Sequence, residues 1–87
     1  MKGRALVAWN LRRMRVQQGI SQVKLAADAE VDRAYLGGLE RETENPTIDL
    51  LDRIAEALSV SVTELLRQPA PGEMPPKNLP YGRKPSQ

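Results

Sequence analysis

The chain has 87 residues and a formal net charge of +2, from 13 basic and 11 acidic side chains. Because it contains no cysteine and no histidine, disulfides and thiolate metal sites are excluded and the commonest general base is missing. No apolar run is long enough for a membrane span or a signal peptide. We therefore expect one small cytoplasmic domain with no membrane association, no metal or other cofactor and no catalytic residue.

The apolar spacing predicts five short helices around an aliphatic core, which is a compact all-α fold. The first helix runs from about Arg4 to Gln18, and Gly19 suits the left-handed backbone that often ends a helix. The second and third helices cover about residues 22–29 and 33–41. Helices this short are unstable alone, so they must share a core with their neighbours.

Short polar side chains are placed to cap four of these helices. Ser21 and Asp32 can accept hydrogen bonds from the free amides of the second and third helices, and Thr47 can do the same for the fourth. Ser61 and Glu64 have the spacing of a capping box for a fifth helix that ends near residue 67. Along the fourth helix, the side chains expected to face the core are Ile48, Leu51, Ile54, Ala55 and Leu58.

The chain divides into one domain and a tail of different composition. Residues 1–68 carry the predicted helices, whereas residues 69–87 hold six of the seven prolines and almost no aliphatic side chain. We expect this Pro-rich C-terminal tail to be disordered or polyproline-like in isolation. It is either an inert solvated tail or an arm that touches DNA or a partner subunit.

The basic residues are concentrated at the N-terminal end of the chain. Residues 1–24 contain six lysines and arginines and no acid, whereas residues 28–64 contain ten of the eleven acids. This asymmetry is typical either of a basic face that contacts phosphates or of an ordinary solvated helix surface.

Five short segments occur in the order and spacing of a known family. They are L-R-R-M-R at 11–15, G-I-S-Q-x-x-L-A at 19–26, L-x-x-L-E-R at 36–41, N-P-T at 45–47 and A-E-A-L-S-V at 55–60. Through these segments, residues 11–66 resemble the Cro/CI-type (XRE-like) helix-turn-helix DNA-binding family. The resemblance implies a five-helix lambda-repressor-like domain whose third helix enters the major groove of double-stranded DNA.

The resemblance also implies roles for individual side chains. Carried over by position, the base-contacting candidates are Arg33, Ala34 and Gly38. Arg33 can bond both O6 and N7 of one guanine, and Ala34 can meet a thymine methyl group. Gly38, next to Gly37, either permits close approach of the backbone to DNA or leaves a smooth face.

Further positions match phosphate contacts and a structural ion pair of the family. The phosphate candidates are Ser21, Gln22, Tyr35 and Arg41. Tyr35 can instead be partly buried, and Arg41 can instead be a charge that interacts with the C-terminal end of its helix. Arg15 and Glu40 match a partly buried ion pair between the first and third helices.

Three turn positions depart from the family pattern, which usually has glycine there. This chain has Glu30, Glu42 and Ser59, and a left-handed backbone costs about 1 kcal/mol at each of them. In addition, Asp32, Glu42 and Glu44 lie at or beside the expected DNA surface, where a negative charge weakens binding to phosphate.

The leading hypothesis is a sequence-specific transcriptional regulator that binds a palindromic operator as a homodimer. The candidate dimer residues form an apolar cluster, of which two can instead close the core of a single subunit: Val60, Val62, Leu65 and Leu66. The alternative is a helix-turn-helix module that binds a protein, such as an antitoxin or antiactivator, with weak or no DNA binding. We do not expect an enzyme, because acids spaced along a helix, such as Asp49, Asp52 and Glu56, usually form a solvated face.

Overall fold

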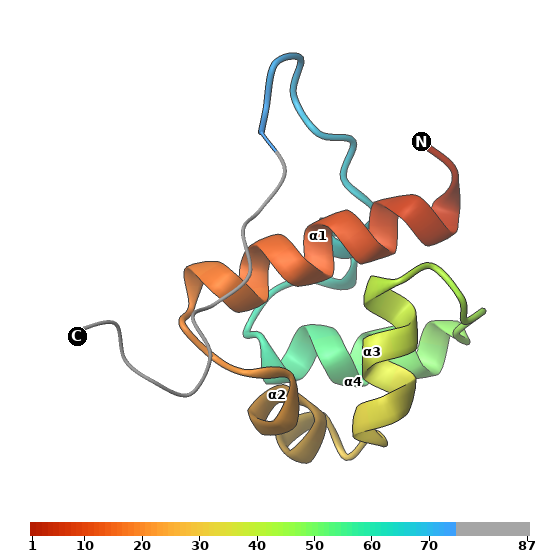
Figure 1. Ribbon diagram of the computed structural model, residues 1–87, viewed down its shortest axis with the longest axis vertical. Helices are drawn as coiled ribbons and strands as arrows, with labels where there is room; N and C mark the ends of the chain where they lie inside the picture. Colours follow the sequence, from red (N-terminus) through yellow and green to blue (C-terminus); the bar gives the residue numbers. More distant parts are fainter. Residues whose placement is uncertain (75–87) are drawn as a thin grey trace.

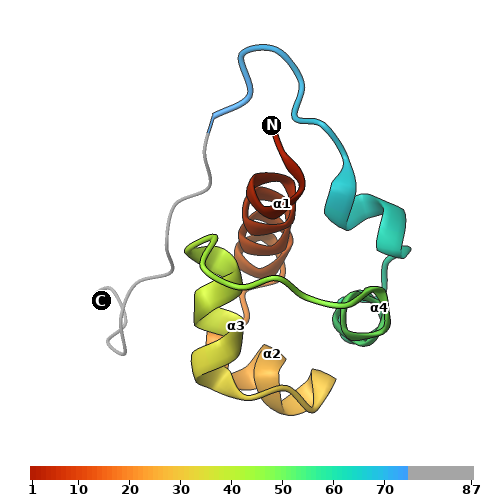
Figure 2. The ribbon, with the colours of Figure 1, turned by 90° about the vertical axis from the view of Figure 1, so that its right-hand side faces the viewer.

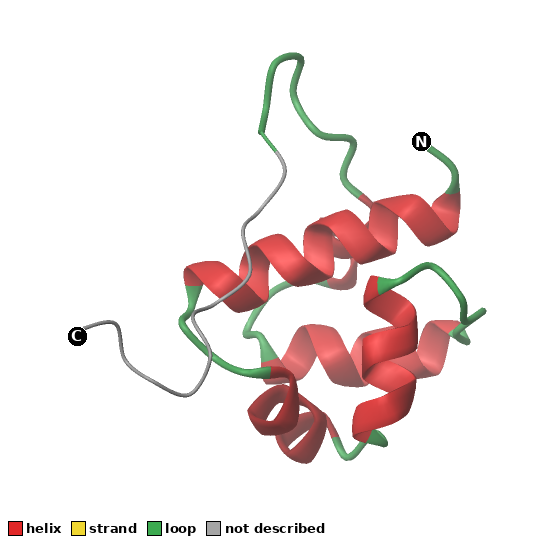
Figure 3. Ribbon diagram, viewed as in Figure 1, coloured by secondary structure: helices red, strands yellow, loops and turns green. Residues whose placement is uncertain are grey.

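The computed structural model describes residues 1–74, which form four α-helices and one short 3-10 helix without any strand (Figures 1 and 3). The elements are α1 (Gly3–Gln17), α2 (Gln22–Ala29), α3 (Arg33–Glu40), α4 (Ile48–Ala57) and the 3-10 helix η1 (Val62–Leu66). The all-α prediction is confirmed, and the fifth predicted helix is this 3-10 turn. None of these helices is long and apolar enough to cross a bilayer. Residues 75–87, most of the predicted tail, lie outside the described part.

The five elements pack in a closed ring around one core. α1 packs mainly against α3 and η1, α2 packs against α3 and α4, and α4 closes the ring on η1. Figure 2 looks nearly along α1 and α4, and shows that α3 and α2 lie on the side of the ring opposite η1. Each element contributes a fully buried aliphatic side chain to the core: Leu11, Leu25, Leu36, Ile54 and Leu65. Helices as short as α2 and α3 are marginal alone, so this shared core stabilises them.

Three predicted caps fix where α2, α3 and α4 begin. The side-chain oxygens of Ser21, Asp32 and Thr47 each accept a hydrogen bond from the backbone amide three residues later, at 3.0–3.1 Å. These caps are confirmed, and each satisfies an amide that the helix leaves free. The predicted capping box of η1 is wrong, because Ser61 accepts a bond but Glu64 pairs with an arginine three residues later.

The turns keep the left-handed backbone of the family pattern, although three of them lack glycine. Glu30, Glu42 and Ser59 have φ angles of 59°, 66° and 61°. Gly19, which ends the turn after α1, has the same conformation with a φ of 69°. The three residues that stand in place of glycine therefore adopt the left-handed backbone themselves, at a cost of roughly 1 kcal/mol of local strain for each residue.

The structure decides where two apolar side chains lie. Ile48 was expected in the core but is 63% exposed, because it is the first residue of α4 and precedes the buried stripe of that helix. Leu65 is a candidate dimer contact that can instead close the core of a single subunit, and the structure shows the second of these, because Leu65 is completely buried in that core. A side chain that is buried within its own subunit has no surface left to contact a second subunit. Leu65 is therefore removed from the dimer candidates.

One buried polar side chain anchors the end of the fold to α1. Asn10 is fully buried, and its Nδ2 lies 2.9, 3.1 and 2.8 Å from the carbonyl oxygens of Leu6, Leu65 and Arg67. The last two carbonyls belong to η1 and to the residue that follows it. Because the end of a helix leaves its carbonyls unpaired, the Asn10 amide supplies donors that η1 lacks.

A second contact holds the chain beyond η1 beside the domain. Glu73 accepts a hydrogen bond from the amide of Ala70 at 2.9 Å, and its carboxylate lies 3.4 Å from Arg67 and 3.9 Å from Arg13. The Ala70 amide and the two guanidinium groups hold the pKa of Glu73 below its usual value. The first residues after η1 thus contact the domain through charged groups.

We expect Asn10→Ala to lower the free energy of unfolding by about 1–3 kcal/mol, because buried carbonyl oxygens of η1 lose their donor. Urea unfolding followed by circular dichroism measures the change. Gln17→Ala, at an exposed position of the same helix, is the control and should change stability by less than about 0.5 kcal/mol. Equal effects of the two substitutions would show that the Asn10 bonds contribute nothing to stability.

Candidate nucleic-acid interface

A buried ion pair joins α1 to α3. Nε of Arg15 donates to Oε2 of Glu40 at 2.6 Å, and Nη2 donates to Oε1 at 2.9 Å. Only 5% and 1% of the two side chains are exposed. The third guanidinium nitrogen donates to the carbonyl of Ile20, in the turn that leads into α2. The two residues that the family resemblance pairs are therefore brought together, and Arg15 also holds the turn before the helix-turn-helix.

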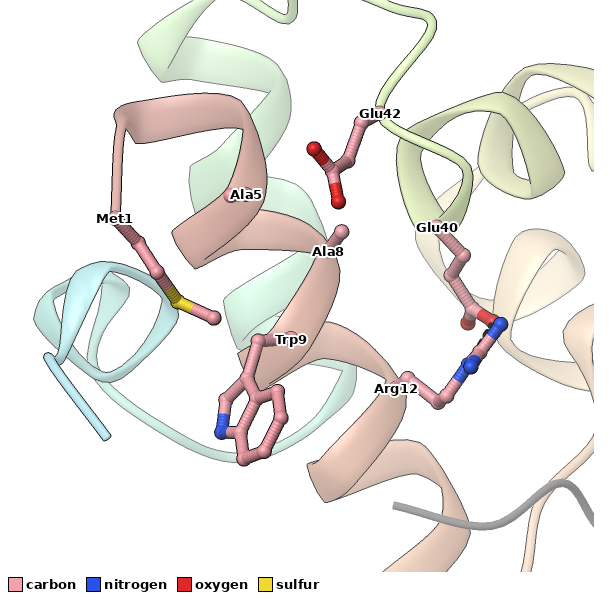
Figure 4. Close-up of a pocket in the computed structure, with 7 residues that line it drawn as sticks. All are labelled: Met1, Ala5, Ala8, Trp9, Arg12, Glu40 and Glu42. Carbon is pink, nitrogen blue, oxygen red and sulfur yellow. Dashed lines mark ion pairs between the residues drawn. The ribbon is translucent and has the colours of Figure 1, made fainter. Parts of the chain in front are cut away.

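Glu40 also binds side chains from α1 and α2. Its Oε1 accepts a hydrogen bond from Nε2 of Gln22 at 3.1 Å and lies 3.6 Å from Nε of Arg12. Figure 4 shows Arg12 reaching from α1 towards Glu40, at the edge of a shallow hollow that Met1 and Trp9 also line. One carboxylate thus connects α1, α2 and α3.

The network continues outward to Arg33 at the start of α3. A carboxylate only accepts hydrogen bonds, so the amide nitrogen of Gln22 must face Glu40 and the amide oxygen is directed elsewhere. That oxygen accepts a hydrogen bond from Nη1 of Arg33 at 2.9 Å. The exposed guanidinium is therefore oriented by a side chain that is anchored on a buried charge. Since a guanidinium has five N–H donors, Arg33 can bond Gln22 and a ligand together.

Gly37 lets two guanidinium groups lie over the middle of α3. A Cβ at this position would lie 3.1 Å from Nη1 of Arg41 and 3.7 Å from Nη1 of Arg33. Arg41 is the C-cap residue of α3 and is exposed, as are Arg33 and Ala34 near the start of the helix. The outer face of α3 therefore carries positive charge from both of its ends, brought together across a glycine.

Gly38 is not available for a base contact, contrary to the prediction. It is buried, because the loop after α3 folds back over it and the Thr43 hydroxyl donates to its carbonyl at 3.1 Å. A Cβ at Gly38 would lie only 2.6 Å from Cγ of Glu44. The sequence predicts that Gly38 is open to DNA, but the loop after α3 occupies the space beside it.

The four phosphate candidates lie in different surroundings. Ser21 is exposed and its hydroxyl caps α2, whereas Gln22 is half-buried in the network described above. Tyr35 is half-buried and packs against the core, and Arg41 is exposed. The structure therefore brings Gln22 and Arg41 together with Arg33.

Arg53 of α4 holds the turn between α2 and α3, a role that the sequence did not predict. Its Nε donates to the carbonyl of Ala29 at 3.2 Å and its Nη2 donates to that of Glu30 at 3.3 Å. These are free carbonyls at the C-terminal end of α2. Arg53 is the only basic residue of α4, which is the one signal in the sequence that singles it out.

Comparison with protein families identifies the class of this domain. Residues 11–65 match the HTH_3 family model, which describes a helix-turn-helix. The chain belongs to this helix-turn-helix family. The match confirms the resemblance on which the assignment of α2 and α3 depends, and it agrees with the expectation that the chain is not an enzyme.

Similar proteins of known sequence are named as transcription factors or regulators. The chain is 38% identical to a hypothetical transcription factor of Neisseria meningitidis over 66 residues, which are 76% of the chain and 62% of that protein. It is 39% identical to an uncharacterised HTH-type transcriptional regulator of Sinorhizobium fredii, over 76% of its own length and 86% of the relative's. The chain thus spans less than two thirds of the Neisseria protein.

Solved structures with the same fold include two that are similar over most of the chain. The crystal structure of the hypothetical transcription factor NHTF from Neisseria has a TM-score of 0.76 and 37% identity, and the match covers 78% of both chains. The restriction-modification controller protein C.AhdI from Aeromonas hydrophila has a TM-score of 0.69 and 34% identity, over 71% of this chain and 94% of that one.

We expect Glu40→Gln to lower the free energy of unfolding by about 3–5 kcal/mol, because it leaves the buried charge of Arg15 without its partner. Urea and thermal unfolding measure the loss. Glu42→Gln is the matched control, since it makes the same chemical change at an exposed position two residues away and should stay within about 0.5 kcal/mol of the wild type. Similar losses in the two variants would contradict the structural role of the pair.

Proposed function

We propose that this chain is a sequence-specific, double-stranded DNA-binding transcriptional regulator with α3 in the major groove. The observation that carries the proposal is the exposed guanidinium of Arg33, which Gln22 and the buried Glu40 orient at the start of α3. Family membership and relatives named as transcriptional regulators support it. In helix-turn-helix proteins, residues at the N-terminal end of the second helix of the motif contact the base edges.

Two exposed side chains at the start of α3 offer different base contacts. Arg33 can donate two hydrogen bonds to O6 and N7 of a guanine, and the methyl group of Ala34 can pack on a thymine. The bond from Arg33 to Gln22 restricts the guanidinium before DNA arrives, so less side-chain entropy is lost on binding. We therefore assign a guanine to Arg33 and a thymine to Ala34.

The residues around Arg33 and Ala34 carry groups that can bind the phosphates of the DNA backbone. The first turn of α2 offers free amides and the positive end of the helix dipole beside Ser21 and Gln22. Arg41 adds a cation near the end of α3, and Tyr35 adds a hydroxyl group. We assign these four residues to phosphate contacts, which fix the register of the protein on the duplex without reading the sequence.

We assign the dimer contact to apolar side chains around η1. Leu66 is 41% exposed, and Val60 and Val62 are half-buried. Leu66 and the two valines leave apolar surface exposed to water, and a second copy of the chain could bury this surface. Such a dimer would place its two α3 helices about 34 Å apart, in successive major grooves of a palindromic operator.

A second candidate function is a module that binds a protein, such as an antitoxin or antiactivator, in place of DNA. Three acids near α3 favour it, since Asp32 and Glu42 are exposed and Glu44 is half-buried. Their charges repel phosphate, so the cations of α3 must offset them if the chain binds a duplex.

Arg33→Ala should weaken binding to the duplex that the wild type selects by about 10- to 100-fold, because it deletes a bidentate base contact. It should also remove the guanine preference at one position. Selection from random duplexes, followed by fluorescence anisotropy titrations, measures both effects. Arg41→Ala is the control: removal of a phosphate contact should weaken binding to all sequences alike and lower the salt slope by about 1.

The outcome for the wild type decides between the two candidate functions. A regulator should bind the selected duplex with an affinity that falls steeply as salt concentration rises. A wild-type chain that selects no duplex at any salt concentration would contradict DNA binding and favour the protein-binding module.

Leu66→Glu should shift the protein from dimer to monomer in sedimentation equilibrium, because it places a charge in the proposed apolar contact. It should keep its helix content, since this side chain is 41% exposed in a single subunit. Ile48→Glu, at an apolar position that is 63% exposed, is the control and should leave association unchanged. A monomeric wild-type chain would contradict the homodimer.

A further inference from the structure

The side chain of Glu44 takes the place of the side chain that Gly38 lacks. Residues four apart on a helix lie in one row, so Ala34 and Gly38 belong to the same row of α3. Ala34 is exposed, whereas the next place in the row is covered by Glu44. A Cβ at Gly38 would lie 2.6 Å from Cγ and 3.0 Å from Oε2 of Glu44. The carboxylate therefore lies on the row of α3 that begins at Ala34.

The loop that carries Glu44 is fixed to α3. The amide of Thr43 donates to the carbonyl of Gly38 at 2.9 Å, and the Thr43 hydroxyl donates to the same oxygen at 3.1 Å. Glu42 has a φ of 66° and turns the chain back towards the helix. Unlike Glu40, Glu44 belongs to none of the ion pairs formed among residues 1–74. The loop that carries the Glu44 charge is thus anchored to α3 through Thr43, and no ion pair among residues 1–74 neutralises that charge.

We propose that Glu44 is a specificity-determining residue that selects a cytosine next to the base met by Ala34. This inference rests on the proposed binding of α3 in the major groove. A carboxylate only accepts hydrogen bonds. In the major groove, guanine and thymine present acceptors, whereas cytosine and adenine present an amino donor. Adenine also presents the acceptor N7 beside its amino group, so the carboxylate favours cytosine.

An acid on the face of α3 that enters the major groove raises specificity in two ways. It attracts the correct base, and it repels the phosphates and bases of incorrect sequences. Specificity is a difference between affinities, and an unfavourable contact with the wrong sequence contributes to it. Glu44 repels phosphates and the acceptors of guanine and thymine, and only cytosine presents a donor without an acceptor beside it on the same base. It therefore weakens binding to every duplex, but weakens binding least at the correct site.

Site selection with two isosteric variants, Glu44→Gln and Glu42→Gln, tests this role in the full chain. Both variants remove one negative charge from the same loop, so both should strengthen binding to unselected duplexes by the same factor. Only Glu44→Gln should lose the cytosine preference at one position. Its affinity for the duplex that the wild type selects should fall about tenfold relative to Glu42→Gln, a typical effect of one mismatched base pair.

Gly38→Ala gives an independent test that leaves Glu44 in the chain. The added Cβ forces Glu44 away from α3, because the two carbons would be only 2.6 Å apart. We expect the same loss of cytosine preference, with the guanine preference assigned to Arg33 retained. Retention of that guanine preference also shows that the variant is folded and that α3 is intact.

The possible failures of this inference and of the proposed function are distinguishable. If both glutamine variants strengthen binding to every duplex equally and the selected sequence does not change, Glu44 reads no base, although the chain still binds DNA. If the wild type selects a site without the cytosine, the conclusion is the same. If the wild type selects no duplex, the proposed function fails and this inference fails with it.

Discussion

The buried carboxylate of Glu40 holds three helices in one arrangement. It accepts two hydrogen bonds from Arg15 in α1 and one from Gln22 in α2, while its own backbone ends α3. A buried carboxylate is costly unless it is paired and hydrogen-bonded. Separation of these helices would therefore leave a charge unsatisfied as well as expose the core. The two helices of the helix-turn-helix thus keep their relative position although each is only eight residues long.

The same carboxylate also sets the chemistry of the outer surface. An amide side chain has one nitrogen and one oxygen, so a nitrogen that satisfies Glu40 leaves the oxygen to meet Arg33. The group that orients the proposed base-reading arginine is therefore the group that stabilises the fold. Stability and recognition are coupled here through Gln22, which is only half-buried and contributes to both.

Side chains of opposite charge lie against the two adjacent glycines of α3. Gly37 leaves room for the guanidinium groups of Arg33 and Arg41, whereas Gly38 leaves room for the carboxylate of Glu44. The outer face of α3, which we propose enters the major groove, is therefore built largely from side chains that reach it from the ends of α3 and from the following loop. A surface of mixed charge attracts DNA less in general, and it relies more on the match between its individual groups and the bases.

The sequence by itself determined the all-α fold, the helix caps at Ser21, Asp32 and Thr47, and the family, because helix period, capping and motif spacing are local properties of the chain. The pairing of Arg15 with Glu40 was reached only through the resemblance. Tertiary structure decided the burial of Leu65, the cover of Gly38 and the anchoring role of Asn10. Asn10 binds a carbonyl 55 residues away, and its role depends on which distant segment the fold places beside it. Burial and the partner of a polar group are properties of the packed chain, so no local pattern reveals them.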